Sequence, residues 1–116
     1  MPLAKLQVAG TTVADKKSTV LREVSRILAQ TTGKPEAVIM VTLEDDAEAL
    51  MGGEPGPAAF IDIRGIGGLD REVNTQTTER LCALLWDELG IAPSRVYVTF
   101  TDVPAANWGW NGKTFG

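Results

Sequence analysis

Residues 38–43 read Val38-Ile39-Met40-Val41-Thr42-Leu43, a nearly continuous apolar run. A short run of this kind predicts a strand that is buried on both faces. A helix is predicted just before it, over residues 17–31, because apolar residues recur there at helical spacing, and Gly33 is expected to cap that helix. A strand covered on one face is predicted at residues 3–8 and ends at Gly10. The first half of the chain therefore has the order strand, helix, strand.

The second half of the chain repeats this order. Strands are predicted at residues 59–63 and 96–100, with a helix over about residues 70–89 between them. Shifting the first half along the chain superposes Leu28 on Leu85 and Gly33 on Gly90. We expect an α/β (α+β) fold in one domain of 116 residues, with β-α-β repeats at about 2–43 and 58–101. Right-handed crossovers would place both helices on one face of a four-stranded sheet.

The segments outside the repeats have their own signals. Residues 44–57 are acidic and then rich in glycine and proline, so they are expected to form the connector between the repeats. Residues 104–116 are expected to form a C-terminal ribbon, because Asn111-Gly112 favours a tight type I′ hairpin turn.

The second face of the predicted sheet has no helix to cover it. The run at residues 38–43 would place apolar side chains on both faces of its strand. An exposed apolar area of that size usually marks an interface between subunits. The sequence therefore predicts a symmetric oligomer whose sheets cover each other.

Composition excludes several classes of function. The chain has no histidine, which removes Ser-His-Asp and Cys-His nucleophile systems and most catalytic zinc sites. The single Cys82 is expected in the core, and one cysteine is compatible with a reducing cytoplasm. The net charge is -4 and the basic residues are scattered, so the sequence predicts no basic surface for binding nucleic acid. No apolar stretch is long enough to cross a membrane, so we expect a cytoplasmic protein.

Two stretches could bind a ligand through backbone or carboxylate groups. Gly65-Ile66-Gly67-Gly68 lies between a strand and a helix, but Asp70 occupies the position where a dinucleotide-binding loop needs a small residue. It is interpreted as a tight turn whose N–H groups could hold a small carboxylate. The acidic run at residues 45–48 lacks the spacing of a calcium loop and is interpreted as solvated, so no metal site is expected.

The beginning of the chain offers a less usual chemical group. Removal of Met1 would leave Pro2 with a free secondary amine just before the first strand. An α-amino group titrates at about 7.7–8.0, and an apolar pocket beside a cation lowers that pKa, which gives a general base without histidine. The alternative is that Met1-Pro2 is an ordinary chain start with no catalytic meaning.

Several motifs together resemble the macrophage migration inhibitory factor family of the tautomerase superfamily. They span essentially the whole chain: Pro2 at the first strand, Thr32-Gly33-Lys34-Pro35, Gly65-Ile66-Gly67-Gly68, Arg95-Val96-Tyr97 and Asn107-Trp108-Gly109-Trp110-Asn111-Gly112-Lys113-Thr114-Phe115. The resemblance implies two β-α-β units in each subunit of a homotrimer.

The resemblance also implies a cofactor-independent keto–enol tautomerase that acts on phenylpyruvate-like 2-keto acids. Pro2 would be the general base, and Lys34 and the Ile66 backbone N–H would hold oxygen atoms of a small aromatic keto-acid substrate. Tyr97 would come from the adjacent subunit, so the active sites would lie between subunits. The other expected substrate-binding residues are Val38, Arg64, Thr99, Trp108, Trp110 and Phe115. Neither a cofactor nor a metal is implied.

A second class of function stays open on the same resemblance. The chain could be a trimeric, cytokine-like signalling protein with a residual tautomerase pocket and a receptor as its partner. Release without a signal peptide would then be the alternative to a cytoplasmic location. Replacing Pro2 by glycine would separate the two hypotheses, because it would abolish tautomerisation and leave signalling intact.

Overall fold

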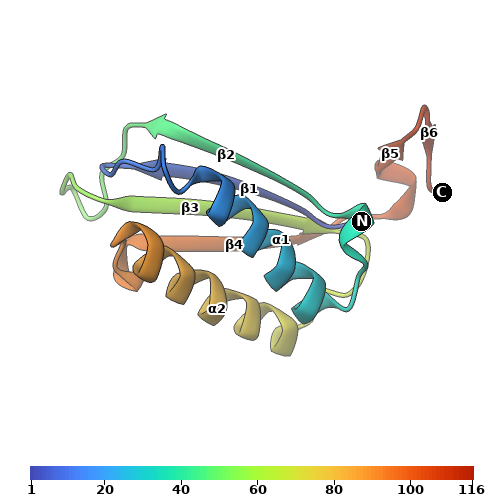
Figure 1. The fold of residues 1–116 in the computed structure, drawn as a ribbon. Coiled ribbons are helices and arrows are strands. Elements are labelled where there is room, and N and C mark those ends of the chain that lie inside the picture. The colour runs from blue at the N-terminus through green and yellow to red at the C-terminus, as the bar shows by residue number, and fades with distance from the viewer.

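A computed structural model describes all residues, 1–116, as a four-stranded mixed sheet with two helices on one face (Figure 1). The strand order is β2-β1-β3-β4, in which β1 runs parallel to β2, β3 runs parallel to β4, and the central pair β1 and β3 is antiparallel. This arrangement confirms the fold class expected from the two sequence repeats. The elements are β1 (Leu3–Ala9), α1 (Lys17–Thr32), β2 (Met40–Ala47), β3 (Ala58–Gly65), α2 (Arg71–Leu89), β4 (Val96–Asp102), β5 (Gly109–Trp110) and β6 (Lys113–Thr114), with short 3-10 helices at Glu36–Val38, Pro93–Arg95 and Ala105–Asn107.

The core lies between the sheet and the two helices. Alternate residues of β1 and β3 point into it, and they meet one apolar stripe from each helix. Both helices end where the sequence predicts, because Gly33 and Gly90 adopt left-handed backbone conformations with φ of 73° and 67°. Asp70 begins α2, and its carboxylate accepts a hydrogen bond from the Val73 N–H at 2.9 Å. Neither helix is long and apolar enough to span a membrane.

The second strand differs from its prediction. Val38 belongs to a 3-10 turn, so β2 begins only at Met40, and it runs on through the acidic residues to Ala47. These acidic residues were expected in the connector, which is therefore shorter than predicted. The strand is not buried on both faces, because β2 is an edge strand and its residues alternate between exposed and half-buried.

The face of the sheet without helices is also not the apolar surface predicted. The strand registers place four residues in one row across its middle, and all of them are polar: Thr42, Lys5, Asp62 and Thr99. Larger apolar side chains lie only toward the two ends of this face, including Met40, Phe60 and Tyr97. An apolar face therefore gives no argument for an oligomer. Cys82 also departs from expectation, because it is only partly buried at the edge of the core.

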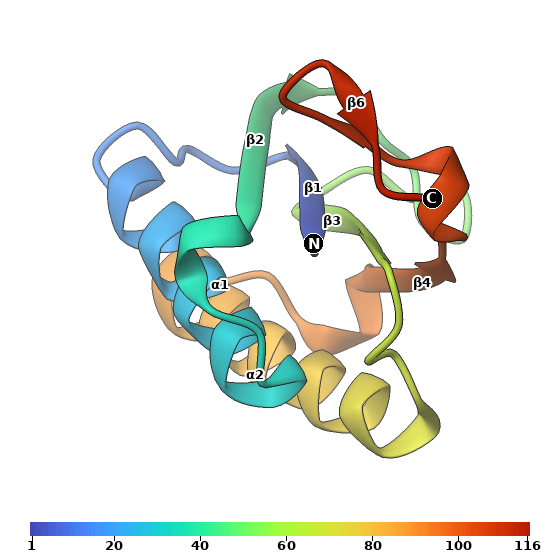
Figure 2. The ribbon, with the colours of Figure 1, turned by 90° about the vertical axis from the view of Figure 1, so that its right-hand side faces the viewer.

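The C-terminal ribbon forms the predicted hairpin. Strands β5 and β6 pair in antiparallel fashion, and both turn residues have positive φ, 52° at Asn111 and 79° at Gly112. The ribbon lies at the same end of the molecule as the N-terminus (Figures 1 and 2). Distant parts of the sequence therefore meet at this end.

Candidate active site

A pocket of about 400 Å³ lies beside the start of β1. Its walls come from three stretches of the chain: residues 1–3, residues 37–40 and residues 108–110. Pro2 is buried there, and its carbonyl oxygen accepts a hydrogen bond from the Met40 N–H at 3.1 Å. The pocket brings together four residues predicted from the sequence: Pro2, Val38, Trp108 and Trp110.

Lys34 extends from the end of α1 over the glycine turn that follows β3. A Cβ atom at Gly68 would lie 3.3 Å from Lys34 Cε and 4.0 Å from Lys34 Nζ, so the lysine chain rests directly against this glycine. In the same turn, the Gly67 N–H donates to the Asp102 carboxylate at 2.8 Å. The Ile66 N–H makes no hydrogen bond within the chain, which leaves a free backbone donor in the same turn, two residues before Gly68. Neither Lys34 nor Ile66 lines the pocket of the single chain.

The charge of Lys34 affects the pKa of the Met1 amino group. Partial burial lowers the pKa of the Met1 amino group below its ordinary value of 8.0, and the positive charge of Lys34 lowers that pKa further. Both effects favour the uncharged amine. The surroundings of the chain start therefore shift the protonation equilibrium of the Met1 amine toward its uncharged form.

The aromatic ribbon forms one side of the pocket. Trp110 stacks on Phe115, with ring centroids 6.2 Å apart and planes at 9°. The Phe115 N–H also donates to the Trp108 carbonyl at 3.1 Å. Phe115 does not line the pocket itself, and its stacking supports the Trp110 side chain that does.

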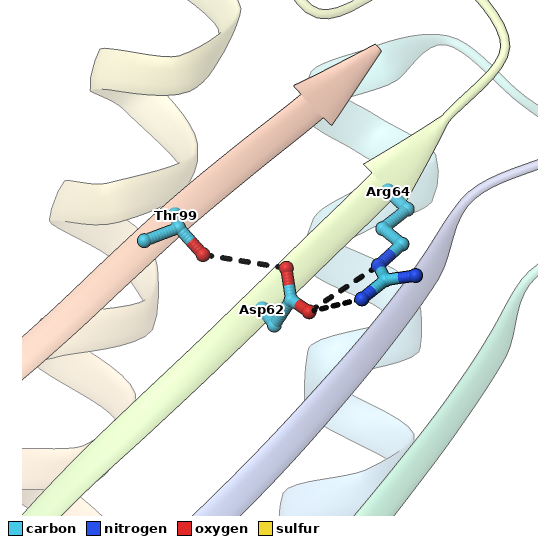
Figure 3. Close-up of polar contacts among 3 residues, drawn as sticks. All are labelled: Asp62, Arg64 and Thr99. Atoms are coloured by element: carbon cyan, nitrogen blue, oxygen red, sulfur yellow. Dashed lines mark hydrogen bonds and ion pairs between the residues drawn. The ribbon is translucent and has the colours of Figure 1, made fainter. Parts of the chain in front are cut away.

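The other predicted site residues lie apart from this pocket in the single chain. Asp62 holds two of them on the open face of the sheet: the Arg64 guanidinium donates to Asp62 Oδ2 at 3.1 Å, and the Thr99 hydroxyl donates to Asp62 Oδ1 at 3.3 Å (Figure 3). Tyr97 lines a different hollow of about 170 Å³, together with Phe60 and the 47–51 segment. Of Arg64, Thr99 and Tyr97, Arg64 lies nearest to the pocket, because it pairs with the pocket residue Leu3 between strands β3 and β1.

Asp62 and Asp102 are polar residues that sequence reasoning missed. A signal existed for Asp62, because a residue two positions before Arg64 in a strand must share its face. No such signal existed for Asp102, since it reaches Gly67 from a different strand 35 positions along the chain. No group of three or more Cys, Asp or Glu side chains is placed to hold a metal ion.

Comparison with known proteins gives one family. The sequence profile of "Macrophage migration inhibitory factor (MIF)" matches residues 1–116. The macrophage migration inhibitory factor of Rattus norvegicus is 41% identical over 95 residues, which cover 82% of this chain and 83% of the rat protein. A homolog from Brugia malayi is 34% identical over 99 residues, which cover 85% of this chain and 86% of the worm protein.

Solved structures agree with the sequence match. The homologue from Prochlorococcus marinus superposes with a TM-score of 0.91 at 38% identity and covers 98% of this chain and 99% of its own. The Entamoeba histolytica MIF-like protein gives a TM-score of 0.92 at 29% identity, with 98% of each chain covered. A protein crystallised after inactivation by 2-oxo-3-pentynoate gives 0.86 at 25% identity, covering 97% of this chain and 94% of that one. The chain belongs to the macrophage migration inhibitory factor family.

Proposed function

We propose that this protein is a cofactor-independent keto–enol tautomerase of 2-keto acids such as phenylpyruvate. One observation carries the proposal: Pro2 lies buried in a pocket at the chain start, where burial and the charge of Lys34 lower the pKa of the adjacent Met1 amine. The family match supports isomerase chemistry in general. One structural relative was crystallised after inactivation by a 2-keto acid, 2-oxo-3-pentynoate, which supports a substrate of that class.

The reaction begins with proton removal from the carbon next to the keto group. After loss of Met1, the Pro2 nitrogen takes this proton, and the electron pair of the broken C–H bond forms the carbon–carbon double bond of the enolate. The carbonyl oxygen gains the negative charge and then takes a proton from the protonated Pro2 nitrogen, directly or through water, which completes the enol and restores the free base. A base placed in this way contributes about 10²–10⁴-fold to the rate.

Two donors face the oxygen atoms of the substrate in this proposal. Lys34 supplies a positive charge, and the free Ile66 N–H supplies a hydrogen bond beside it. Donors fixed in advance stabilise an enolate more than the neutral ketone, because the charge on oxygen develops only during the reaction. Val38, Trp108 and Trp110 give an apolar wall for an aromatic ring. Phe115 supports that wall through its stacking on Trp110.

The complete site is proposed to form in a homotrimer. Tyr97 and Thr99 do not reach the pocket of their own chain, and Tyr97 is 64% exposed on the open face. In the trimer we propose, these side chains and the Asp62-bound Arg64 lie at the border with a neighbouring subunit and complete its pocket. Size determination in solution checks the assembly, and a monomer with full activity would refute the shared site.

Activity is expected to follow the fraction of chains that have lost Met1. Intact-mass measurement gives that fraction, and the absorbance of the phenylpyruvate enol gives the turnover of the same samples. In chains that keep Met1 the Pro2 nitrogen is an amide without basicity, so they should be inactive. Full activity of protein that wholly retains Met1 would overturn the assignment of Pro2 as the base.

A cytokine-like binding protein is the second candidate, supported by the names of the mammalian relatives. The substitution Pro2→Gly distinguishes the two roles if the trimer is retained. It should remove tautomerisation under the first proposal, whereas receptor binding would survive it under the second.

A further inference from the structure

A second hollow, unrelated to the N-terminal pocket, lies along helix α2. It measures about 620 Å³, and its lining residues come from α2 and from the segment that follows it: Thr78, Glu79, Cys82, Ala83, Trp86, Ala92 and Pro93. We call it the α2 groove. Trp86 is 55% exposed there, so much of its indole ring is accessible to a ligand.

The groove occupies a flank of α2 that the rest of the chain does not use. Thr77 and Arg80 connect α2 to α1, by hydrogen bonds to Thr31 at 2.7 Å and to Gln30 at 2.6 Å. Leu81 and Leu85 point from α2 into the core. Glu79 and Trp86 are exposed, so this flank faces outward, while Cys82 at its inner edge is partly buried against the core.

Charge distinguishes this groove from a merely apolar patch. Its single charged lining residue is Glu79, and no lysine or arginine lines it. Glu79 forms no ion pair and no side-chain hydrogen bond in the chain. An unpaired carboxylate therefore lies beside an exposed indole and a row of apolar groups. An organic cation is attracted by both the carboxylate and the face of the indole ring, even where both are exposed to water.

We propose that the α2 groove binds an organic cation with an apolar body, such as a hydrophobic amine. The ammonium group lies between Glu79 and the Trp86 ring, and the apolar body lies against Cys82, Ala83 and Pro93. An anion would be repelled by Glu79, and a neutral molecule would gain only the apolar contacts. The α2 groove shares no lining residue with the N-terminal pocket, so the two sites are separate.

The lone cysteine gives a direct reporter for occupancy. Cys82 is the only cysteine of the chain and lines the groove, so its rate of alkylation by iodoacetamide reports access to this site alone. The probes are 4-phenylbutylamine, 4-phenylbutanol and 4-phenylbutyrate, which share one apolar body and differ in head-group charge. Alkylation of Cys82 in the full-length protein is followed by peptide mass mapping at constant pH while each probe is titrated, because iodoacetamide can also alkylate the free Pro2 amine.

The amine should slow alkylation of Cys82 in a saturable manner, and it should do so at lower concentration than the alcohol, with the carboxylate least effective. Glu79→Gln should weaken binding of the amine by about two- to fivefold, as expected for the loss of an exposed ion pair. It should leave binding of the alcohol unchanged. Trp86→Ala should weaken binding of both the amine and the alcohol. Glu72→Gln is the matched control, because Glu72 is an exposed glutamate of the same helix that does not line the groove, and it should change nothing.

Equal protection by the amine and the alcohol would overturn the proposal, since the site would then recognise only apolar surface. Stronger protection by the carboxylate, or none by any probe, would overturn it as well. If Glu79→Gln and Glu72→Gln weakened the amine equally, the effect would come from overall charge and not from this groove.

Discussion

Lys34 lies against Gly68, so closely that a methyl group on this glycine would come within 3.3 Å of Lys34 Cε. The contact joins the end of α1 to the turn after β3, so a cation reaches the turn that also contains the free Ile66 N–H. The neighbouring Gly67 also has a positive φ, but a Cβ atom there would meet nothing within 4 Å. Alanine substitutions at these two glycines therefore distinguish two effects. Both strain the backbone, but only the one at Gly68 also disturbs the contact with Lys34.

Gly68→Ala should reduce tautomerase activity more than Gly67→Ala. Both substitutions strain the backbone, at φ of 78° and 68°, so both should lower the free energy of unfolding by a similar amount, about 1 to 2 kcal/mol. Only Gly68→Ala also displaces Lys34, which should raise KM for phenylpyruvate. Steady-state kinetics and thermal unfolding of both variants test this, and equal KM values would show that the lysine contact has no role in substrate binding.

Lys34→Met should raise the pKa of the amino group at the chain start. The Met1 amine has its pKa lowered first by burial and second by the charge of Lys34, so removing the charge removes the smaller of the two effects. In protein that has lost Met1, we expect the same influences on the Pro2 amine. The acid limb of the pH–rate profile should then move to higher pH, because the uncharged amine appears only above the new pKa. An unshifted limb would contradict the coupling between lysine and amine, and Lys34→Arg, which keeps the charge, is the control.

Asp62→Asn should change KM and leave kcat nearly unchanged. Asp62 neutralises Arg64 and holds Thr99, but it does not line the N-terminal pocket. Loss of the carboxylate frees the positive charge of Arg64 near the site, so KM for a keto acid should fall by about two- to threefold at low salt and recover at high salt. Glu44→Gln is the control, since Glu44 pairs with Gln7 on the same open face and forms no ion pair. A fall in kcat at constant KM would contradict this role.

Leu85→Ala should destabilise the chain strongly, because Leu85 is fully buried between α2 and the sheet. The cavity left by this change costs about 2 to 5 kcal/mol of the free energy of unfolding. Leu84 is the adjacent leucine and is only partly buried, so Leu84→Ala should cost clearly less. Urea unfolding measures both, and equal losses would mean that α2 packs differently from this description.

The open face shows where prediction from local sequence fails. The run at residues 38–43 looks fully buried, but part of it forms a 3-10 turn and the rest forms an edge strand. Whether a strand lies at the centre or the edge depends on which strands pair with it, and a single stretch of sequence does not contain that information. The polar row from Thr42 to Thr99 likewise exists only after four strands have aligned in register.

The sequence by itself determined the order of helices and strands, the glycine ends of both helices, the Asn111-Gly112 hairpin and the presence of Pro2 beside the first strand. These features follow from side-chain periodicity and local backbone preference, which act over a few residues. Only the tertiary structure decided that Pro2, Val38 and Trp108 share one pocket, that Lys34 rests on Gly68, and that Asp62 joins Arg64 to Thr99. Those contacts join residues far apart along the chain, so they depend on strand register and on packing of the whole fold.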